Sequence, residues 1–312
     1  MKSKIALLLG CLVIGTTSVN AMTLNKNGYY ENSRGAIISQ DEYISLKKEN
    51  KDDEIDRMSR EVIDLYLDPK MNRKENTIYE ITTYKLDSNG KIVDEKSMLS
   101  NEIDAKRVAQ NDNLIVGDKG KLVDKNLVRN NYSLASTLNY VDDYTYATAS
   151  KRVTGNYFYD SSIGKYVIQV WATWYTTPTI KQFDVIAARW NNSVSVSGLT
   201  AWQDCDSNTG ITYYDLANGN VKYTNYGLGV SMNIHDSAKN RIELFMRVES
   251  SNYFGYDFYA TYQHARNSNA NTLAISKSYS FSSSGLGGVL YYSNSTYRNY
   301  YDGMQGIHYH YE

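Results

Sequence analysis

Residues 166–190 read YVIQVWATWYTTPTIKQFDVIAARW. Two runs rich in β-branched and aromatic residues, 166–175 and 183–190, lie on either side of a short polar segment. Such runs are typical of β-strands, because branched and aromatic side chains pack well on a pleated surface. The stretch therefore predicts two strands that follow each other in the chain.

Further strand candidates continue to the end of the sequence, and Asn218-Gly219 is a hairpin-turn signal between two of them. No helical pattern separates them, so the sequence predicts a mainly β fold, an antiparallel β-sandwich or barrel-like domain. The segment 151–312 is long enough for one such core. The additional candidates are residues 211–214, 221–226, 229–234, 241–248, 253–262, 272–281, 289–292 and 307–311.

The distribution of aromatic and charged residues suggests where the domains begin. All four Trp and all six Phe lie after residue 150, whereas charged residues are concentrated before it. This change in composition predicts a small charged α+β region at 22–109, a linker or loosely packed connection at 110–150, and a Tyr/Trp-rich β-sandwich domain at 151–312.

The front region carries helix and hairpin signals. Ser39 and Glu42 fit a capping box, and an apolar pattern continues to Asp68-Pro69, where proline disfavours a helix. Residues 78–84 and 91–93 flank the turn signal Asn89-Gly90 and predict a hairpin. A second short helix is expected to begin near Ser100.

The first 21 residues resemble a secretory signal peptide. Lys2 and Lys4 precede an apolar run that is shorter than the roughly 20 residues of a membrane span, and small residues precede a cleavage site after Ala21. Lipoprotein processing at Cys11 is the less favoured route, because the apolar segment continues past this cysteine. We expect a secreted protein.

The cysteine content argues against a disulfide-stabilised protein, and the charge argues against a nucleic-acid-binding protein. Cleavage after Ala21 leaves Cys205 as the single cysteine, so no internal disulfide can form. The formal net charge is -1 and no basic run is present, which argues against a nucleic-acid partner.

One segment has the spacing of a calcium loop. Oxygen-bearing side chains at alternate positions, followed by a later carboxylate, suit a hard cation. The candidate ligands are Asp204, Asp206, Asn208 and Asp215. An Asx-rich turn between strands is the alternative interpretation. No cofactor is required by any motif, and calcium is the one that the pattern suggests.

Aromatic side chains are the candidates for ligand binding. Trp171, Trp174, Trp190 and Trp202, together with many of the 30 Tyr, are candidate flat platforms for a sugar or a protein surface. The alternative is that these rings simply fill a sheet. The expected partner is a cell-surface, glycan or protein molecule.

Catalytic and metal-binding signals are weak. His308 and His310 would share one face of a strand, but only two ligands are close in sequence. Cys205 with His235 or His264 has no local support as a nucleophile and base, and neither a nucleophile elbow nor a zinc-protease motif is present.

The front pattern Gly35-x-x-Ile38-Ser39-x-x-Glu42-Tyr43-x-x-Leu46 resembles the front of many secreted proteins of Gram-positive bacteria. The back half is similar to uncharacterised exported proteins of the same bacteria, through residues 183–190, 227–233, 262–265 and 285–289. The resemblance implies export and a β-rich C-terminal domain, and it implies no activity.

These observations lead to one main functional hypothesis and two alternatives. The main hypothesis is a secreted bacterial protein that binds a partner without catalysis through aromatic residues of the β domain. The first alternative is a membrane-active toxin, because residues 193–197 and 278–282 alternate Ser with apolar residues, although a spanning strand needs about 9 to 11 residues. The second alternative is a secreted hydrolase with dispersed carboxylates.

Overall fold

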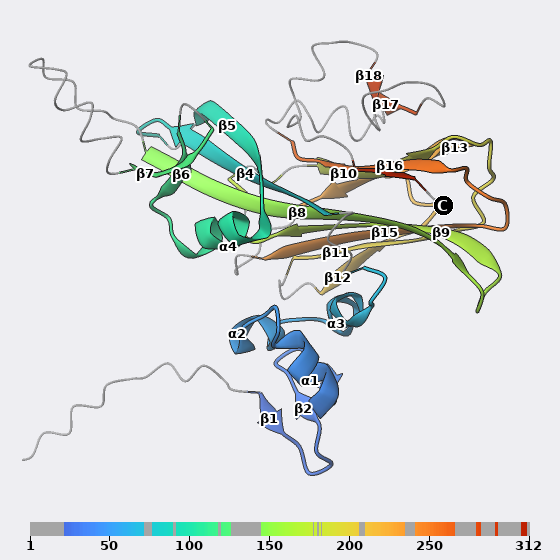
Figure 1. The fold of residues 1–312 in the computed structure, drawn as a ribbon, viewed down its shortest axis with the longest axis horizontal. Coiled ribbons are helices and arrows are strands. Elements are labelled where there is room, and N and C mark those ends of the chain that lie inside the picture. The colour runs from blue at the N-terminus through green and yellow to red at the C-terminus, as the bar shows by residue number, and fades with distance from the viewer. Residues whose placement is uncertain are drawn as a thin grey trace, which may run out of the picture. The chain divides into compact units, whose positions relative to one another are not determined.

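The computed structural model describes residues 22–71, 77–89, 92–117, 120–125, 145–176, 178–179, 181, 183–205, 210–234, 241–265, 279–281, 291–292 and 307–310. The chain forms two compact units, a front unit ending at Leu67 and a main unit starting at Asp68 (Figure 1). The expected signal peptide, including Cys11, lies outside the described residues. Within the described part of the chain, no helix combines the length and apolar character needed to cross a bilayer.

The front unit contains a small sheet and three short helices. Its elements are β1 (Thr23–Leu24), β2 (Tyr30–Glu31), β3 (Ile37–Ile38), α1 (Gln40–Leu46), α2 (Asp52–Ile55) and α3 (Arg60–Leu67). The predicted capping box is confirmed: Glu42 N–H donates to Ser39 Oγ, and Ser39 N–H donates to the Glu42 carboxylate. Helix α3 ends at Leu67, just before Asp68-Pro69, as expected.

The continuous apolar pattern of residues 43–65 is divided among three helices. The buried Asn32 amide donates to the carbonyl groups of Ile55 and Met58, at 3.0 and 2.7 Å, where α2 has ended. Ser59 Oγ accepts from Val62 N–H at 3.3 Å and so caps the start of α3. Side chains that satisfy the carbonyl and amide groups at these helix ends therefore favour a break that apolar spacing alone did not predict.

The main unit is an antiparallel β-sandwich, and the predicted mainly β, antiparallel fold is confirmed. The first sheet has the strand order β12-β11-β15-β9-β8-β4-β5 and the second has the order β13-β14-β10-β16-β19. Neither sheet closes into a barrel among the described strands. The first sheet comprises β12 (Ile211–Tyr214), β11 (Gly198–Asp204), β15 (Ile242–Ser250), β9 (Lys165–Trp174), β8 (Thr145–Asp160), β4 (Thr77–Leu86) and β5 (Ile92–Ser100). The second comprises β13 (Val221–Thr224), β14 (Gly227–Asn233), β10 (Phe183–Trp190), β16 (Asp257–Gln263) and β19 (Ile307–His310).

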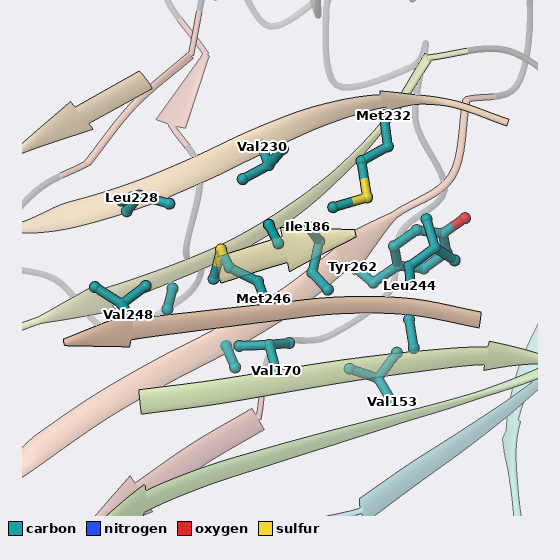
Figure 2. Close-up of a cluster of buried hydrophobic side chains, with 14 of the residues drawn as sticks. Val153, Val170, Ile186, Leu228, Val230, Met232, Leu244, Met246, Val248 and Tyr262 are labelled. Carbon is teal, nitrogen blue, oxygen red and sulfur yellow. The ribbon is translucent and has the colours of Figure 1, made fainter. Parts of the chain in front are cut away.

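The core lies between the inner faces of these two sheets (Figure 2). Alternate residues of β9 and β15 point into it from the seven-stranded sheet, and alternate residues of β10, β14 and β16 point into it from the other sheet. Figure 2 shows side chains from strands of both sheets in the space between them. Burial of this apolar surface supplies the main stabilisation of the unit. The labelled side chains are Val153, Val170, Ile186, Leu228, Val230, Met232, Leu244, Met246, Val248 and Tyr262.

The front hairpin belongs to the sandwich, which differs from the predicted boundary near residue 150. Strand β4 pairs with β8 from Thr77 opposite Thr154 to Leu86 opposite Thr145. On the inner face, Tyr84 joins the main core. On the outer face, Ile81 packs in a second apolar cluster with residues of α4 (Glu102–Gln110) and β6 (Leu114–Val116).

The expected linker at 110–150 is also partly structured. Strands β6 and β7 (Leu122–Asp124) pair, and β8 begins at Thr145. Thr148 Oγ1 and Ser150 Oγ on β8 donate to the carbonyl groups of Leu114 and Ala105. The structure of residues 110–150 depends on contacts with segments far apart in sequence, and local composition does not predict such contacts.

The Ser-alternating segments of the toxin hypothesis do not form long strands in the described residues. Residues 193–197 precede β11 and form no strand, although Val194 is buried while Ser193 and Ser195 are exposed. In the second segment, β17 covers Tyr279–Ser280 and pairs with β18 (Tyr291–Tyr292), while residues 278 and 282 lie outside the described part.

Candidate binding surface

The four tryptophans named as candidate platforms are all buried. Trp174 and Trp190 point into the core between the sheets, and each is 0% exposed. Trp171 and Trp202 lie on the opposite face of the seven-stranded sheet and are 0% and 3% exposed. All four rings are therefore almost inaccessible to solvent in this structure. A ligand role for these residues stays an untested prediction.

Three of the four indole N–H groups donate a hydrogen bond within the protein, which offsets the cost of burying them. Trp171 Nε1 donates to Glu243 at 2.6 Å, Trp174 Nε1 donates to Tyr262 Oη at 2.8 Å, and Trp190 Nε1 donates to the Asn225 carbonyl at 2.8 Å. A buried indole N–H needs such an acceptor. The three side chains are therefore integrated into the packing of the sandwich.

The structure describes two of the four predicted calcium ligands, Asp204 and Asp215. Asp204 is the last residue of β11 and is buried, whereas Asp215 follows β12 and its carboxylate accepts from Ala217 N–H at 2.9 Å, as in an Asx turn. Asp206 and Asn208 lie outside the described residues. Within the described part of the chain, no three His, Cys, Asp or Glu side chains form a group that could hold a metal ion.

A line of contacting rings lies at one end of the sandwich, and we call it the aromatic strip: Tyr159, Tyr166, Tyr253, Tyr256 and His310. The successive ring centroids are 5.0, 5.3, 5.5 and 5.9 Å apart. The strip joins the β8–β9 hairpin, the loop between β15 and β16, and the C-terminal strand β19. Tyr159, Tyr256 and His310 are exposed.

The strip rests on buried aromatic residues of the core. Tyr157 packs edge-on against Phe254 and Phe258, with centroids 5.9 and 5.8 Å away, and all three are at most 1% exposed. Tyr253 stacks on Tyr157 at 6.2 Å. Aromatic pairs of this geometry add stabilisation beyond area burial, so the exposed rings sit on a well-packed base.

Main-chain hydrogen bonds hold the loop that carries Tyr253 and Tyr256. Phe254 N–H donates to Tyr157 Oη at 3.2 Å, and Asn192 N–H donates to the Phe254 carbonyl at 3.0 Å. Gly255 has φ +109°, a conformation that side-chain-bearing residues rarely adopt. This turn directs Phe254 inward while Tyr256 stays exposed.

Asp257 organises the polar end of the strip. Its Oδ1 contacts His308 Nε2 at 2.8 Å and His310 Nδ1 at 2.9 Å, and its Oδ2 accepts from the Asn191 side-chain amide at 3.1 Å. The hydrogen bonds from His310 and then His308 lower the pKa of the Asp257 carboxyl below its ordinary value. Tyr259 stacks on His308, with centroids 4.5 Å apart.

The chemistry of the strip suits recognition rather than bond breaking. Tyrosine offers an apolar ring and a polar hydroxyl with few rotatable bonds, so it contributes contact area at a low entropic cost. Cys205, the nucleophile considered from the sequence, is buried, and its thiol contacts Gln203 Oε1 at 3.3 Å. Of its proposed bases, His264 is buried and His235 lies outside the described residues.

The sequence contained only a general signal for this surface. It predicted platforms among the tryptophans and many of the tyrosines, but it named only the four tryptophans by position. The clue to the loop is the segment Tyr253-Phe254-Gly255-Tyr256, where glycine separates a core ring from an exposed one. The ring contacts themselves join residues that are up to 87 positions apart, as Tyr166 and Tyr253 are.

Comparisons with known proteins add no identification. No family model and no curated protein matches the chain. A crystal structure of IDO from Bacillus thuringiensis aligns over 71% of this chain and 93% of that chain, with 12% identity and a TM-score of 0.14. A TM-score this low supports neither a shared fold nor a shared function.

Proposed function

We propose that this is a secreted bacterial protein that binds a cell-surface, glycan or protein partner through the aromatic strip, without catalysing a reaction. The observation that supports the proposal is a continuous series of ring contacts that ends in exposed rings on a hydrogen-bonded loop. Secretion rests on the N-terminal sequence alone.

The rigidity of the strip is what favours binding over a purely structural role. Tyr159 and Tyr256 are 47% and 63% exposed, yet each contacts a neighbouring ring that restricts its motion. A preorganised side chain loses less entropy when a partner binds, so more of the contact energy appears as affinity. Tyrosine is also among the residues that dominate binding energy at protein interfaces.

The test compares the chain from residue 22 with a Tyr159→Ala/Tyr256→Ala variant. The whole of this chain is needed, because β4 and β5 complete the seven-stranded sheet and a fragment beginning at 151 would lose them. Tyr223→Ala is the matched control, since Tyr223 is 54% exposed and lies on the edge strand β13, away from the strip. The probes are a glycan array and intact Gram-positive and mammalian cells.

The wild type and the Tyr223→Ala control should bind a common probe. Removal of two interface tyrosines should weaken that binding by about thirtyfold or more, which corresponds to roughly 2 kcal/mol. Equal binding by the double variant, or no binding by the wild type to any probe, would refute the proposal. Dye release from liposomes at concentrations where the protein binds cells would instead favour the membrane-active alternative.

A further inference from the structure

Ionisable side chains are buried inside the sandwich, at positions that face the core. Glu80 on β4 and Lys151 on β8 come from the seven-stranded sheet, and Asp184 on β10 and His264, just after β16, come from the other sheet. Each is at most 4% exposed. Burial of charged groups is costly, so the arrangement of this cluster calls for a chemical explanation.

Asp184 is held by three hydrogen bonds. Its Oδ2 accepts from the Tyr262 hydroxyl and contacts His264 Nδ1 at 2.9 Å, while its Oδ1 accepts from Ala265 N–H at 2.9 Å. Hydrogen bonds to a buried carboxyl group offset the cost of removing it from water. Asp184 is therefore well accommodated within its own sheet.

Lys151 and Glu80 form a buried ion pair between two neighbouring strands of the same sheet. They are directly opposite each other in the β4–β8 register, and Lys151 Nζ lies 3.5 Å from Glu80 Oε1. Charge-assisted hydrogen bonds are usually 2.7–2.9 Å long, so this contact is looser than a well-formed ion pair. The amine also lies beside the rings of Trp174 and Tyr262, 5.0 and 5.5 Å from their centroids.

The surroundings favour the neutral, nucleophilic form of the amine. Burial lowers the pKa of Lys151, against the opposing effect of the charges on Glu80 and Asp184. A neutral lysine amine is a nucleophile, and the two strands keep it next to the Glu80 carboxyl group, which provides the proximity that an intramolecular reaction requires.

We propose that Lys151 and Glu80 condense to form an amide cross-link between strands β4 and β8. A proton passes from the Lys151 ammonium group to the Glu80 carboxylate, and the amine nitrogen then attacks Cδ of the resulting carboxylic acid. An Nζ–Cδ bond replaces the bond from Cδ to the hydroxyl oxygen. One amine hydrogen and that hydroxyl group leave together as water. No oxidant or other reactant is needed.

The cross-link would resolve two physical problems of this core. It replaces two buried ionisable groups with one neutral amide, which is less costly to bury than separate charges. It also ties residue 80 to residue 151 in a chain whose mature form has a single cysteine and so no internal disulfide. A covalent link of this kind restricts the unfolded chain, as a disulfide does.

Mass spectrometry tests the proposal directly. The chain from residue 22 is purified in its folded form and then denatured for intact-mass measurement and tryptic peptide mapping. The matched variants are Lys151→Arg, which removes the reacting amine, and Lys165→Arg, which changes a partly exposed lysine that pairs with Glu249 at 3.0 Å.

The wild type and Lys165→Arg should each have a mass lower than the sequence mass by one water molecule. Lys151→Arg should have its full sequence mass, and the wild-type digest should contain a branched peptide that joins residues 80 and 151. The full sequence mass in the wild type would overturn the proposal, as would a water loss that maps elsewhere, including to an amide between Lys151 and Asp184. If Lys151→Arg does not fold, the wild-type branched peptide alone decides the question.

Discussion

Replacement of Gly255 by alanine should destabilise the sandwich, because this glycine forms the turn beneath the aromatic strip. Its φ of +109° is strained for alanine, and an added Cβ would lie 3.3 Å from both Asn191 Cβ and Asn192 N. The neighbouring backbone cannot move away freely, since Asn192 N–H donates to the Phe254 carbonyl. Non-glycine residues in such conformations cost about 1–3 kcal/mol.

Urea unfolding followed by tryptophan fluorescence measures this cost. All four tryptophans lie in the main unit and are buried, so their emission reports on the sandwich alone. With an m-value of about 2–3 kcal/mol/M, a cost of about 1–3 kcal/mol should lower the unfolding midpoint of Gly255→Ala by roughly 0.3–1.5 M. The same variant should bind strip-dependent probes more weakly, because Tyr253 and Tyr256 would lose their fixed orientation.

Gly219→Ala is the matched control for this experiment. Gly219 lies in the loop between β12 and β13, and an added Cβ there would have no heavy atom within 4 Å. A glycine-to-alanine change at a compatible position leaves stability unchanged or raises it by about 0.4–1 kcal/mol. A Gly255→Ala protein as stable as the wild type would refute the assignment of strain to this turn.

Three further predictions concern Glu243, Asp257 and the calcium loop expected from the sequence. Glu243→Gln should lower the free energy of unfolding in urea by about 1.5–3 kcal/mol, because the buried carboxylate accepts from Trp171, Thr173 and Arg241. The control Glu249→Gln, on the same strand, should lower it by at most about 1 kcal/mol. Equal losses in the two variants would contradict this prediction. The pKa of Asp257 is lowered by its histidine partners, so its contribution to stability is complete above the ordinary carboxyl pKa of about 4 and is lost as the pH falls through the lower folded value. Asp257→Asn should therefore lose less stability than the wild type between pH 5 and pH 2 in urea unfolding, and identical pH profiles would exclude this role. If the predicted loop binds calcium, the ion should raise the thermal midpoint of the wild type but not that of Asp206→Ala, and a wild-type midpoint that calcium leaves unchanged would exclude the site.

Local patterns predicted several strands, one helix cap and one helix end, but they missed β8 and β11. The capping box at Ser39 and Glu42, the end of α3 before Asp68-Pro69, and strand β10 at residues 183–190 follow from rules that involve neighbours in sequence. The division of the chain did not follow from such rules. Strand β4 joins the sandwich through its register with β8, and that pairing depends on contacts some 60 to 80 residues apart.

The exposure of the candidate site residues could not be predicted from local patterns either. Trp171 and Trp174 are three residues apart on one strand, so their side chains point to opposite faces of the sheet. A half-exposed sheet would bury one and expose the other, yet both are 0% exposed. Alternation in a sequence reveals that a strand has two faces, but it does not reveal whether both are covered.

The strand-rich character of the chain and its aromatic surplus after residue 150 could be predicted from the sequence, because strand propensity and composition are properties of the residues themselves. Which aromatic residues are exposed depends on the tertiary structure. The strip from Tyr159 to His310 combines a hairpin, a loop and a terminal strand, and the buried contact of Lys151 with Glu80 joins two strands from opposite sides of the expected boundary. Exposure and proximity depend on which distant segments pack together, and that packing results from burial over the whole core rather than from any local motif.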